Sequence, residues 1–292
     1  MKEVTEETLF EKANILVEAL PYIRKFYGKT FVIKYGGAAQ KDAMLKEAFA
    51  QDIVLLSFIG IKPVVVHGGG PKITEFMKKI GKEPQFIHGY RVTDKETVEI
   101  VEMILGGLIN KEIVQLINSH GGKAVGLTGK DANLLKTEKK YIKISNEEID
   151  IGFVGEVKEV CAQVLEGLQD KGFIPVVAPV GFDEKGQTYN INADTVASAI
   201  AVALKAEKLI ILTDVKGITA EDGSLLSTLN IDDALKLIEE DVITGGMIPK
   251  VYSCINALKG DVRKTHIIDG RIAHSLILEI FTKKGVGTEI IF

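Results

Sequence analysis

Short runs of β-branched and other apolar residues alternate along this chain with longer stretches of helical spacing. The clearest runs are FVIKY (31–35), IKPVVVH (61–67), KAVGLT (123–128), FIPVVAPV (173–180), KLIILT (208–213) and THIID (265–269). Helical spacing is found over residues 43–58, 73–80, 96–119 and 195–204. Runs that are apolar throughout are typical of parallel strands buried on both faces. The alternation therefore predicts an α/β fold, a three-layer αβα sandwich around a mainly parallel sheet, with ligands at the carboxyl ends of the strands.

The stretch 133–160 interrupts this alternation. Its segments LLKTEKKYIKI and IGFVGEVKEV predict exposed antiparallel strands, a hairpin added to the sheet. Such a hairpin could close over a site as a lid, or it could be a solvent-exposed addition with no role at a site. The sequence leaves both interpretations open.

A domain boundary is predicted near GFDEKGQ (181–187), where polar residues and glycine interrupt an apolar strand. It divides the chain into residues 1–26, 27–184 and 185–292. Because no flexible linker separates the last two parts, we expect them to pack closely with a cleft between them.

Composition excludes several classes of protein. The 36 Lys and Arg residues against 40 Asp and Glu give a net charge of −4, so no basic field recruits nucleic acid, and a small-molecule partner is expected. Cys161 and Cys254 are too few for a disulfide framework and fit a reducing cytoplasm. No apolar run approaches the roughly 18 residues that span a bilayer, and the N-terminus is acidic rather than signal-like. The sequence therefore predicts a cytoplasmic protein without membrane contact.

Three glycine clusters follow or precede these elements: KYGG (34–37), HGGG (67–70) and TGG (244–246). The HGGG cluster lies between a predicted strand and Pro71, which suits the first position of a helix. Glycine allows close approach to the backbone, and a helix N-terminus offers free N–H donors, so an anion site is favoured over a purely structural turn. Neither the Walker motif nor the dinucleotide fingerprint is present. His67 is interpreted as strand-end packing.

Polar residues accompany the glycine clusters. Lys34 interrupts an apolar strand, a position where a buried charge needs a partner, and Lys250 follows TGG. Asp194 could be that partner, or it could act only as the N-cap of the helix that follows. Asn190 and Asn192 share one face of an alternating stretch and could contact a polar ligand, or they could be turn formers.

Five segments, KYGG, VHGGGP, GYRVTD, NINAD and GGMIPKV, occur in this order and together resemble the amino acid kinase family. Within it, the chain is similar to the members that phosphorylate N-acetyl-L-glutamate, from about residue 29 to the C-terminus. The resemblance implies the amino acid kinase fold and the conversion of N-acetyl-L-glutamate to N-acetyl-L-glutamyl 5-phosphate by ATP and Mg²⁺, the second step of arginine biosynthesis. It also implies that residues 27–184 bind the amino acid and residues 185–292 bind ATP.

The resemblance also assigns roles to residues. It implies that Lys34 and Lys250 stabilise the transferring phosphoryl group and that Asp194 holds the two lysines. Backbone N–H groups around three glycines would contact the phosphoryl group or the substrate carboxylate: Gly37, Gly69 and Gly70. The implied substrate contacts also include Arg91, Asn190 and Asn192. The implied nucleotide contacts, besides the two lysines, are Thr213, Asp214, Gly245 and Met247.

The implied chemistry requires neither a general base nor a metal cage. A glutamate-type carboxylate, with an ordinary pKa of about 4.3, is already ionised at neutral pH. Phosphoryl transfer then depends mainly on positioning and electrostatic stabilisation. We expect no metal site built by the protein alone, because magnesium would arrive with ATP.

Two other functions are less compatible with these residues. A kinase of the same fold could act on carbamate, aspartate, glutamate or UMP, but the NINAD run and the pairing of Arg91 with Asn190 argue against it. A catalytically silent regulatory subunit would bind amino acids only, and the presence of Lys34, Lys250 and Asp194 argues against that.

The first 26 residues predict an amphipathic helix whose apolar face must be buried. It could dock on its own domain or pair with a neighbouring subunit as an oligomerisation arm. Arginine-sensitive members of the family carry such an arm, so the resemblance favours a hexamer made of three dimers and inhibited by L-arginine. The arginine site would then comprise Tyr22, Lys208, His266, Glu279 and Gly285. A PII-type signalling protein is a further partner that the sequence leaves open.

Overall fold

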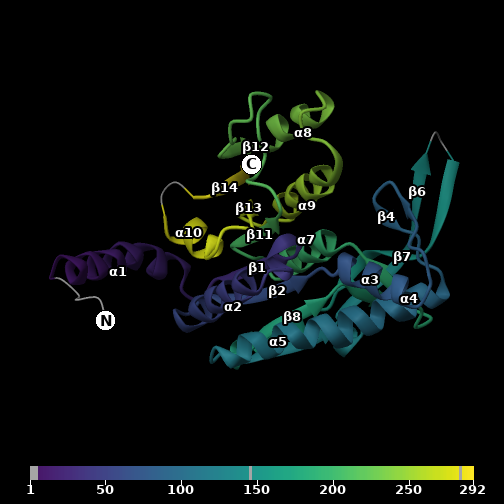
Figure 1. Cartoon of the computed structure of the whole chain (residues 1–292), viewed down its shortest axis with the longest axis horizontal. Coiled ribbons are helices and arrows are strands. Elements are labelled where there is room, and N and C mark those ends of the chain that lie inside the picture. Colours follow the sequence, from purple (N-terminus) through teal and green to yellow (C-terminus); the bar gives the residue numbers. More distant parts are fainter. Residues whose placement is uncertain (1–5, 145–146, 283–284) are drawn as a thin grey trace.

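The computed structural model describes residues 6–144, 147–282 and 285–292. Its centre is an eight-stranded sheet with the strand order β12-β14-β13-β11-β1-β2-β8-β5 (Figure 1). The strands are β1 (Thr30–Tyr35), β2 (Lys62–His67), β5 (Ala124–Thr128), β8 (Ile174–Ala178), β11 (Lys208–Thr213), β12 (Thr228–Asn230), β13 (Lys264–Asp269) and β14 (Gly287–Ile291). Neighbouring strands are parallel except for the antiparallel pair β13 and β14. The predicted mainly parallel sheet is confirmed, and each of the six predicted runs contributes a strand to it.

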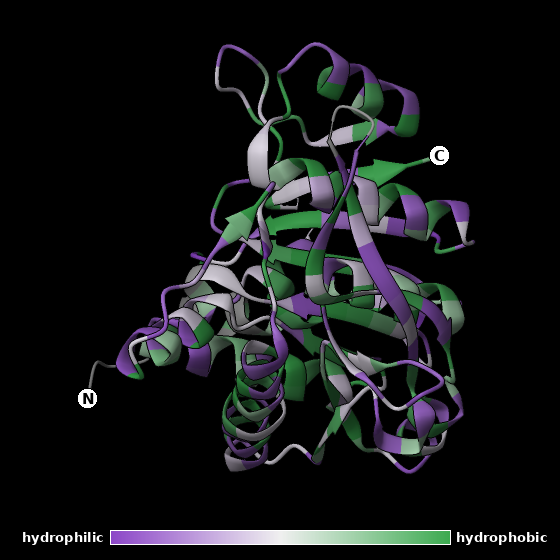
Figure 2. Ribbon diagram, turned by 90° about the vertical axis from the view of Figure 1, so that its right-hand side faces the viewer, coloured by the Kyte–Doolittle hydropathy of each residue, from purple (hydrophilic) through white to green (hydrophobic). Residues whose placement is uncertain are grey.

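Helices cover both faces of this sheet. One hydrophobic core lies under α2 (Ala43–Phe58), α3 (Gly70–Lys79), α5 (Asn110–Ser119) and α10 (Ser275–Phe281). A second core lies under α6 (Gln163–Asp170), α7 (Ala193–Ala203), α8 (Ile231–Glu239) and α9 (Ile248–Lys259). Figure 2 shows the strands between these layers mostly in green, the colour of hydrophobic residues. The αβα sandwich is therefore confirmed.

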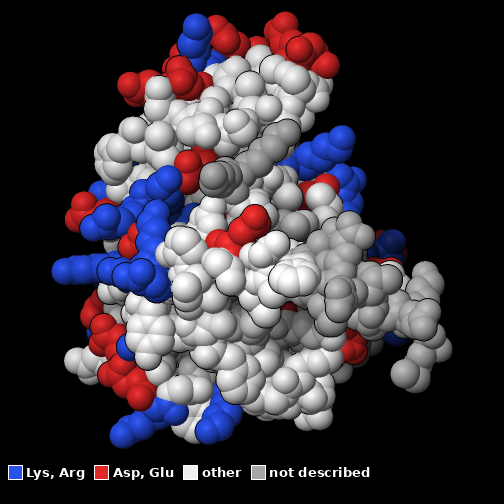
Figure 3. All heavy atoms as spheres, turned by 90° about the vertical axis from the view of Figure 1, so that its left-hand side faces the viewer, with Lys and Arg blue, Asp and Glu red and all other residues white. Residues whose placement is uncertain are grey.

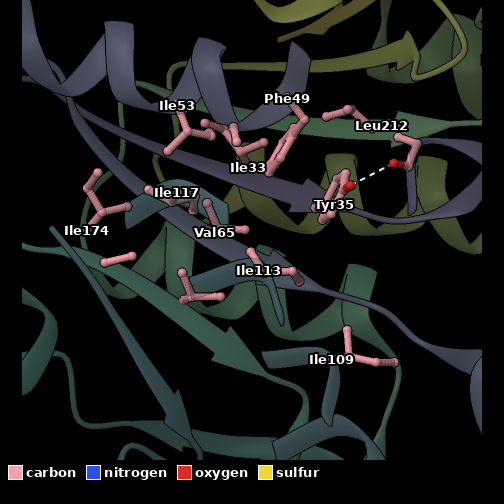
Figure 4. Close-up of a cluster of buried hydrophobic side chains, with 14 of the residues drawn as sticks. Ile33, Tyr35, Phe49, Ile53, Val65, Ile109, Ile113, Ile117, Ile174 and Leu212 are labelled. Atoms are coloured by element: carbon pink, nitrogen blue, oxygen red, sulfur yellow. Dashed lines mark hydrogen bonds between the residues drawn. The ribbon is translucent and has the colours of Figure 1, made fainter. Parts of the chain in front are cut away.

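Side chains of β1 alternate between the two cores, as the period of a strand requires. Ile33 and Tyr35 pack on the α2 side, where Figure 4 shows them with Phe49 and Val65. Tyr35 also donates a hydrogen bond to the carbonyl of Ala39 at 2.6 Å. Val32 belongs to the other core, so Lys34, two residues further along, faces α7 and α9.

The predicted helix over residues 96–119 has three parts. It consists of α4 (Lys95–Glu102), a π-helical segment η2 (Met103–Ile109) and α5. Two glycines occupy the π-helical segment, and at one of them the backbone lies close to β5: a Cβ atom at Gly106 would lie 2.9 Å from Thr128 Cγ2. π-helical turns are often found at functional sites.

The hairpin of β6 (Leu135–Ile144) and β7 (Glu147–Val160) exists, but the prediction that it extends the main sheet is wrong. It forms a separate closed barrel with β9 (Val180–Phe182) and β10 (Thr188–Ile191), in the order β10-β7-β6-β9. Two register shifts in the hairpin explain why its strands curve into a barrel, because bulges bend and twist a strand. The hairpin, in front in Figure 2, is largely purple and white, as expected for exposed strands.

The predicted division at residues 184 and 185 remains a prediction. The main sheet runs through both parts, because β1 pairs with β11 along its length. The barrel also joins them, because β10 pairs with β7 and β9. Among the described helices, none combines the length and apolar character needed to cross a membrane.

Helix α1 (Glu6–Phe26) extends from the body of the molecule (Figure 1), and residues 1–5 of the predicted arm lie outside the described residues. Its last turns make the contacts with the domain: Tyr22 meets Phe281 edge to face, and Phe26 packs on Phe31. Further out, apolar side chains are exposed, among them Leu16 at 73% and Leu20 at 51%. Figure 3, which views this end, shows a broad area where uncharged residues dominate.

Candidate active site

Three charged side chains from three elements meet at the carboxyl end of β1. Lys34 Nζ lies 3.1 Å from Asp194 Oδ1, and Lys250 Nζ donates to Asp194 Oδ2 at 2.7 Å. Lys34 and Asp194 are buried, with 8% and 4% of their surface exposed. Lys34 lies on β1, whereas the other two lie in the first turns of α7 and α9. The fold thus brings residues 34, 194 and 250 together.

The electrostatics of this cluster favour an anion. Burial lowers the pKa of Lys34, and Asp194 opposes that shift. Burial alone would raise the pKa of Asp194, but the charges of Lys34 and Lys250 hold that pKa below its ordinary value. Each oxygen of the Asp194 carboxylate thus lies within about 3 Å of one ammonium group. One carboxylate between two ammonium groups leaves one excess positive charge that a phosphate group can neutralise.

Asn192, rather than Asp194, is the N-cap of α7. Its side-chain oxygen accepts hydrogen bonds from the backbone N–H groups of Asp194 at 2.8 Å and Thr195 at 3.2 Å. The interpretation of Asp194 as a cap is therefore wrong. Because Asn192 satisfies these helix-terminal donors, the Asp194 carboxylate can turn towards the lysines.

Packing explains the middle glycine of the HGGG cluster. Gly69 is the N-cap residue of α3, and a Cβ atom there would lie 2.4 Å from Ile109 Cδ1 and 2.5 Å from Leu105 Cδ2, both in the π-helical segment. Gly70 begins α3 and is followed by Pro71, as the sequence predicts. The first N–H groups of a helix have no carbonyl partner within it, so this turn offers donors to a ligand.

The predicted substrate residues line one small cavity of about 210 Å³: Gly69, Gly70, Arg91, Asn190 and Asn192. Arg91 is buried, and its Nη2 donates to the Gly70 carbonyl at 3.0 Å and to Thr74 Oγ1 at 2.7 Å. Its guanidinium lies 4.7 Å from the centre of the Phe86 ring. The structure therefore holds the arginine rigidly beside the glycine turn.

A larger cavity of about 1220 Å³ lies between the hairpin, α7 and α9. Asp194, Lys250 and Gly245 line it, and so does Lys140 from the hairpin. Asn192 lines both this cavity and the smaller one, so the two meet at the N-terminus of α7.

The other predicted nucleotide contacts are absent from the described lining of the large cavity. Thr213 is buried at the end of β11, and Met247 packs against the core beneath α9. Asp214 adjoins Gly37: a Cβ atom at this glycine would collide with its carboxylate. Gly37 itself lines a third cavity, of about 380 Å³, together with Gly69.

Four residues of the predicted arginine site lie next to one another near the base of α1, and Tyr22, the fifth, lies on α1 itself. Lys208 Nζ lies 2.7 Å from His266 Nε2, and His266 Nδ1 lies 2.7 Å from Glu279 Oε1. A Cβ atom at Gly285 would lie 2.7 Å from Glu279 Oε2, and Tyr22 packs on Phe281 beside them. Burial lowers the pKa of Lys208 to about 8.

Sequence reasoning missed the residues that support the glycine turns. Gln40 donates to the carbonyls of Tyr35 at 3.1 Å and Gly68 at 3.2 Å, so it links the ends of β1 and β2. His67 and Asn110 are fully buried and lie 3.2 Å apart through Nε2 and Nδ2. Asn110 interrupts an apolar helical run, which is a usable signal of a buried polar role, whereas nothing in the sequence singles out Gln40.

Two lysines on one buried carboxylate, beside glycine turns at the carboxyl ends of parallel strands, form an arrangement suited to phosphate-bearing anions. Comparison with known proteins identifies the class further. The chain belongs to the amino acid kinase family, whose model matches residues 29–269, and it is a kinase.

Individual relatives are similar over nearly the whole chain. A protein named acetylglutamate kinase from Syntrophus aciditrophicus is 57% identical over 293 residues, covering 98% of this chain and 99% of that protein. A protein of the same name from Desulforamulus reducens is 60% identical over 284 residues, covering 96% of this chain and 98% of that protein.

Among solved structures, N-acetylglutamate synthase from Neisseria gonorrhoeae has the same fold. Its complex with coenzyme A and N-acetyl-glutamate gives a TM-score of 0.85 at 29% identity and covers 96% of this chain. Its complex with coenzyme A and L-arginine gives a TM-score of 0.82 at 27% identity and also covers 96% of this chain. The chain spans 63% and 65% of the synthase chains in these two structures.

Proposed function

We propose that this kinase transfers the γ-phosphoryl group of ATP to the γ-carboxylate of N-acetyl-L-glutamate and so catalyses the second step of arginine biosynthesis. The observation that carries the proposal is the meeting of two cavities at Asn192. The smaller one contains the buried Arg91, suited to a substrate carboxylate, and the larger one contains Lys250 and Asp194. Relatives named acetylglutamate kinase, at 57% and 60% identity, support the substrate.

The residues of the site fit ATP, because the cluster of Lys34, Asp194 and Lys250 has one excess positive charge and adjoins the large cavity. ATP, as its magnesium complex, supplies the phosphoryl group. Lys250 and Lys34 offset the negative charge that builds up between the two anionic reactants. Asp194 holds both ammonium groups in place, so little reorganisation is needed during the reaction.

On the acceptor side, Arg91 and Asn190 orient the substrate through its α-carboxylate. The γ-carboxylate is then directed towards the N–H groups of Gly69 and Gly70. Because it is ionised at neutral pH, the chain needs no general base. Gly245, Met247, Thr213 and Asp214 are proposed to contact the nucleotide.

An acceptor panel tests this function. Purified protein is incubated with ATP and Mg²⁺ and, in turn, N-acetyl-L-glutamate, L-glutamate, L-aspartate, carbamate or UMP, and acyl phosphate is trapped as its hydroxamate. We expect turnover with N-acetyl-L-glutamate well above that with the others. Preferential turnover of another acceptor would overturn the substrate assignment, and the absence of any turnover would support a silent regulatory subunit.

We also propose that the chain is a hexamer inhibited by L-arginine. The exposed apolar side of α1 supports subunit pairing through this helix. The buried Lys208, His266 and Glu279 offer charges of both signs beside the base of the helix, as recognition of an amino acid requires. Further support comes from N-acetylglutamate synthase, which shares this fold over 65% of its chain and has been solved in complex with L-arginine. Arginine would inhibit by binding one arrangement of the subunits better than another.

A further inference from the structure

The carbonyl of Gly68 accepts two side-chain hydrogen bonds. His67 Nδ1 lies 3.0 Å from it, and Gln40 Nε2 lies 3.2 Å from it. The N–H of the same glycine donates to the Tyr35 carbonyl at 2.9 Å, and Gln40 donates to that carbonyl too. The turn between β2 and α3 is therefore tied to the end of β1.

These two bonds determine where the next N–H points. The carbonyl of Gly68 and the N–H of Gly69 belong to one planar trans peptide unit, in which they point in opposite directions. When Gln40 and His67 hold the carbonyl, the Gly69 N–H must point away from both. Glycine resists rotation less than other residues, so a peptide between two glycines keeps one orientation only when other groups hold it.

Asn110 determines which nitrogen of His67 carries the proton. Burial lowers the pKa of His67 to about 4, so its ring is neutral at physiological pH and has one N–H. A carbonyl can only accept, so Nδ1 carries this hydrogen and donates to Gly68. Nε2 then accepts from the Asn110 amide, which also donates to the Val176 carbonyl at 2.9 Å.

We propose that Gln40 and His67, the latter fixed by Asn110, are positioning residues that aim the Gly69 N–H at the acceptor carboxylate or the transferring phosphoryl group. The inference rests on the proposed function for the identity of that ligand. The three side chains act through the peptide between Gly68 and Gly69. Their effect should therefore appear mainly in kcat, because a donor aimed at developing charge stabilises the transition state.

Two substitutions of one residue separate this role from plain packing. In His67→Asn, the amide nitrogen can occupy the place of Nδ1 and keep the bond to Gly68. In His67→Gln, the amide reaches the place of Nε2 instead, so the contact with Asn110 is kept and the bond to Gly68 is lost. We expect His67→Gln to lower kcat about 10-fold to 100-fold with KM for ATP nearly unchanged, and His67→Asn to retain most of kcat. Equal losses in both variants would overturn the proposal.

A variant of Gln40 tests the proposal even if the His67 variants fail to fold. Gln40 is only partly buried, and Gln40→Met keeps its length while removing both hydrogen bonds. We expect a similar fall in kcat with a nearly unchanged melting temperature. Wild-type kcat in Gln40→Met would contradict the role of Gln40.

Crystal structures of ligand-free wild type and Gln40→Met give a readout that does not depend on the reaction. We expect a rotated or doubly oriented peptide between residues 68 and 69 in the variant, and an identical single orientation would overturn the inference. If the wild type prefers another acceptor, the substrate proposal fails, but the same kinetic comparison can be made with that acceptor. The two failures are therefore distinguishable.

Discussion

The side-chain oxygen of Asn192 accepts a hydrogen bond from the backbone N–H of Asp194 at 2.8 Å, so the first residue caps the helix and the second is left to bind lysines. Two neighbouring polar residues thus have separate physical roles. This separation predicts different consequences for their substitution.

Asn192→Ala should lower the free energy of unfolding by about 1 kcal/mol, the usual loss for a helix N-cap. Asp194→Asn should lower it by about 3 kcal/mol or more, because two lysines lose their counter-charge in a buried site. It should also lower kcat. Urea denaturation of both variants and the wild type measures the difference, and losses in the reverse order would contradict these roles.

Lys250→Ala should lower kcat about 100-fold or more while changing KM for ATP by less than about threefold, because its charge acts mainly where phosphoryl charge develops. Lys259→Ala, at the exposed end of the same helix, is the matched control and should behave like the wild type. Steady-state kinetics of the wild type, Lys250→Ala and Lys259→Ala measure kcat and KM for this comparison. Unchanged turnover in Lys250→Ala would refute the catalytic role.

Arg91→Lys should raise KM for N-acetyl-L-glutamate about tenfold and leave KM for ATP within about twofold. Lysine cannot reproduce the planar guanidinium that bonds Gly70 and Thr74 and stacks on Phe86. Titration of each substrate at saturating concentrations of the other measures both constants. A matching rise for ATP would mean that Arg91 does not serve the amino acid.

If the chain is the hexamer proposed above, deletion of residues 1–26 should yield active dimers with much weaker inhibition by arginine. Because the deletion also removes Tyr22 and Phe26, which pack on the domain, the double variant Leu16→Glu with Leu20→Glu is the cleaner test. It places charge on the exposed apolar side of α1 and leaves the base of the helix intact. Light scattering measures the mass, and arginine titration the inhibition, of the wild type, the deletion variant and the double variant. A double variant that stays hexameric would leave α1 without a role in assembly.

The stability of the chain should depend on pH through Asp52. This carboxylate is buried in α2, lies 2.6 Å from His274 Nδ1 and accepts backbone N–H groups at the start of α10. Burial raises its pKa to about 6, so the folded state binds the proton more tightly than the unfolded state. The resulting stabilisation is present below pH 4 and is lost as pH rises through 6.

The expected loss is up to about 3 kcal/mol, because one pKa unit corresponds to about 1.4 kcal/mol. Asp52→Asn cannot ionise, so the difference in unfolding free energy between wild type and variant should fall over this pH range. Denaturant unfolding at several pH values measures it. A difference that is constant with pH would show that the carboxyl titrates normally.

The sequence by itself determined the layers of the fold and predicted most residues of the candidate site. Strand runs such as KLIILT are apolar throughout, and only burial on both faces of a sheet accounts for that pattern. Lys34 could be singled out because a charge in such a run requires a partner. Gly69 and Arg91 could be predicted as site residues because the segments that contain them, VHGGGP and GYRVTD, resemble the amino acid kinase family.

Only the tertiary structure decided how these residues meet. Asn192 and Asp194 are both good helix caps by residue type, and the choice between them depends on where Lys34 and Lys250 lie, far away in the sequence. The hairpin has the same alternating pattern whether it extends the main sheet or closes a barrel, because pairing partners are not encoded in the pattern of one strand. Gln40 has no local signal, since its partners are two backbone carbonyls that come together only when β1 and β2 pair.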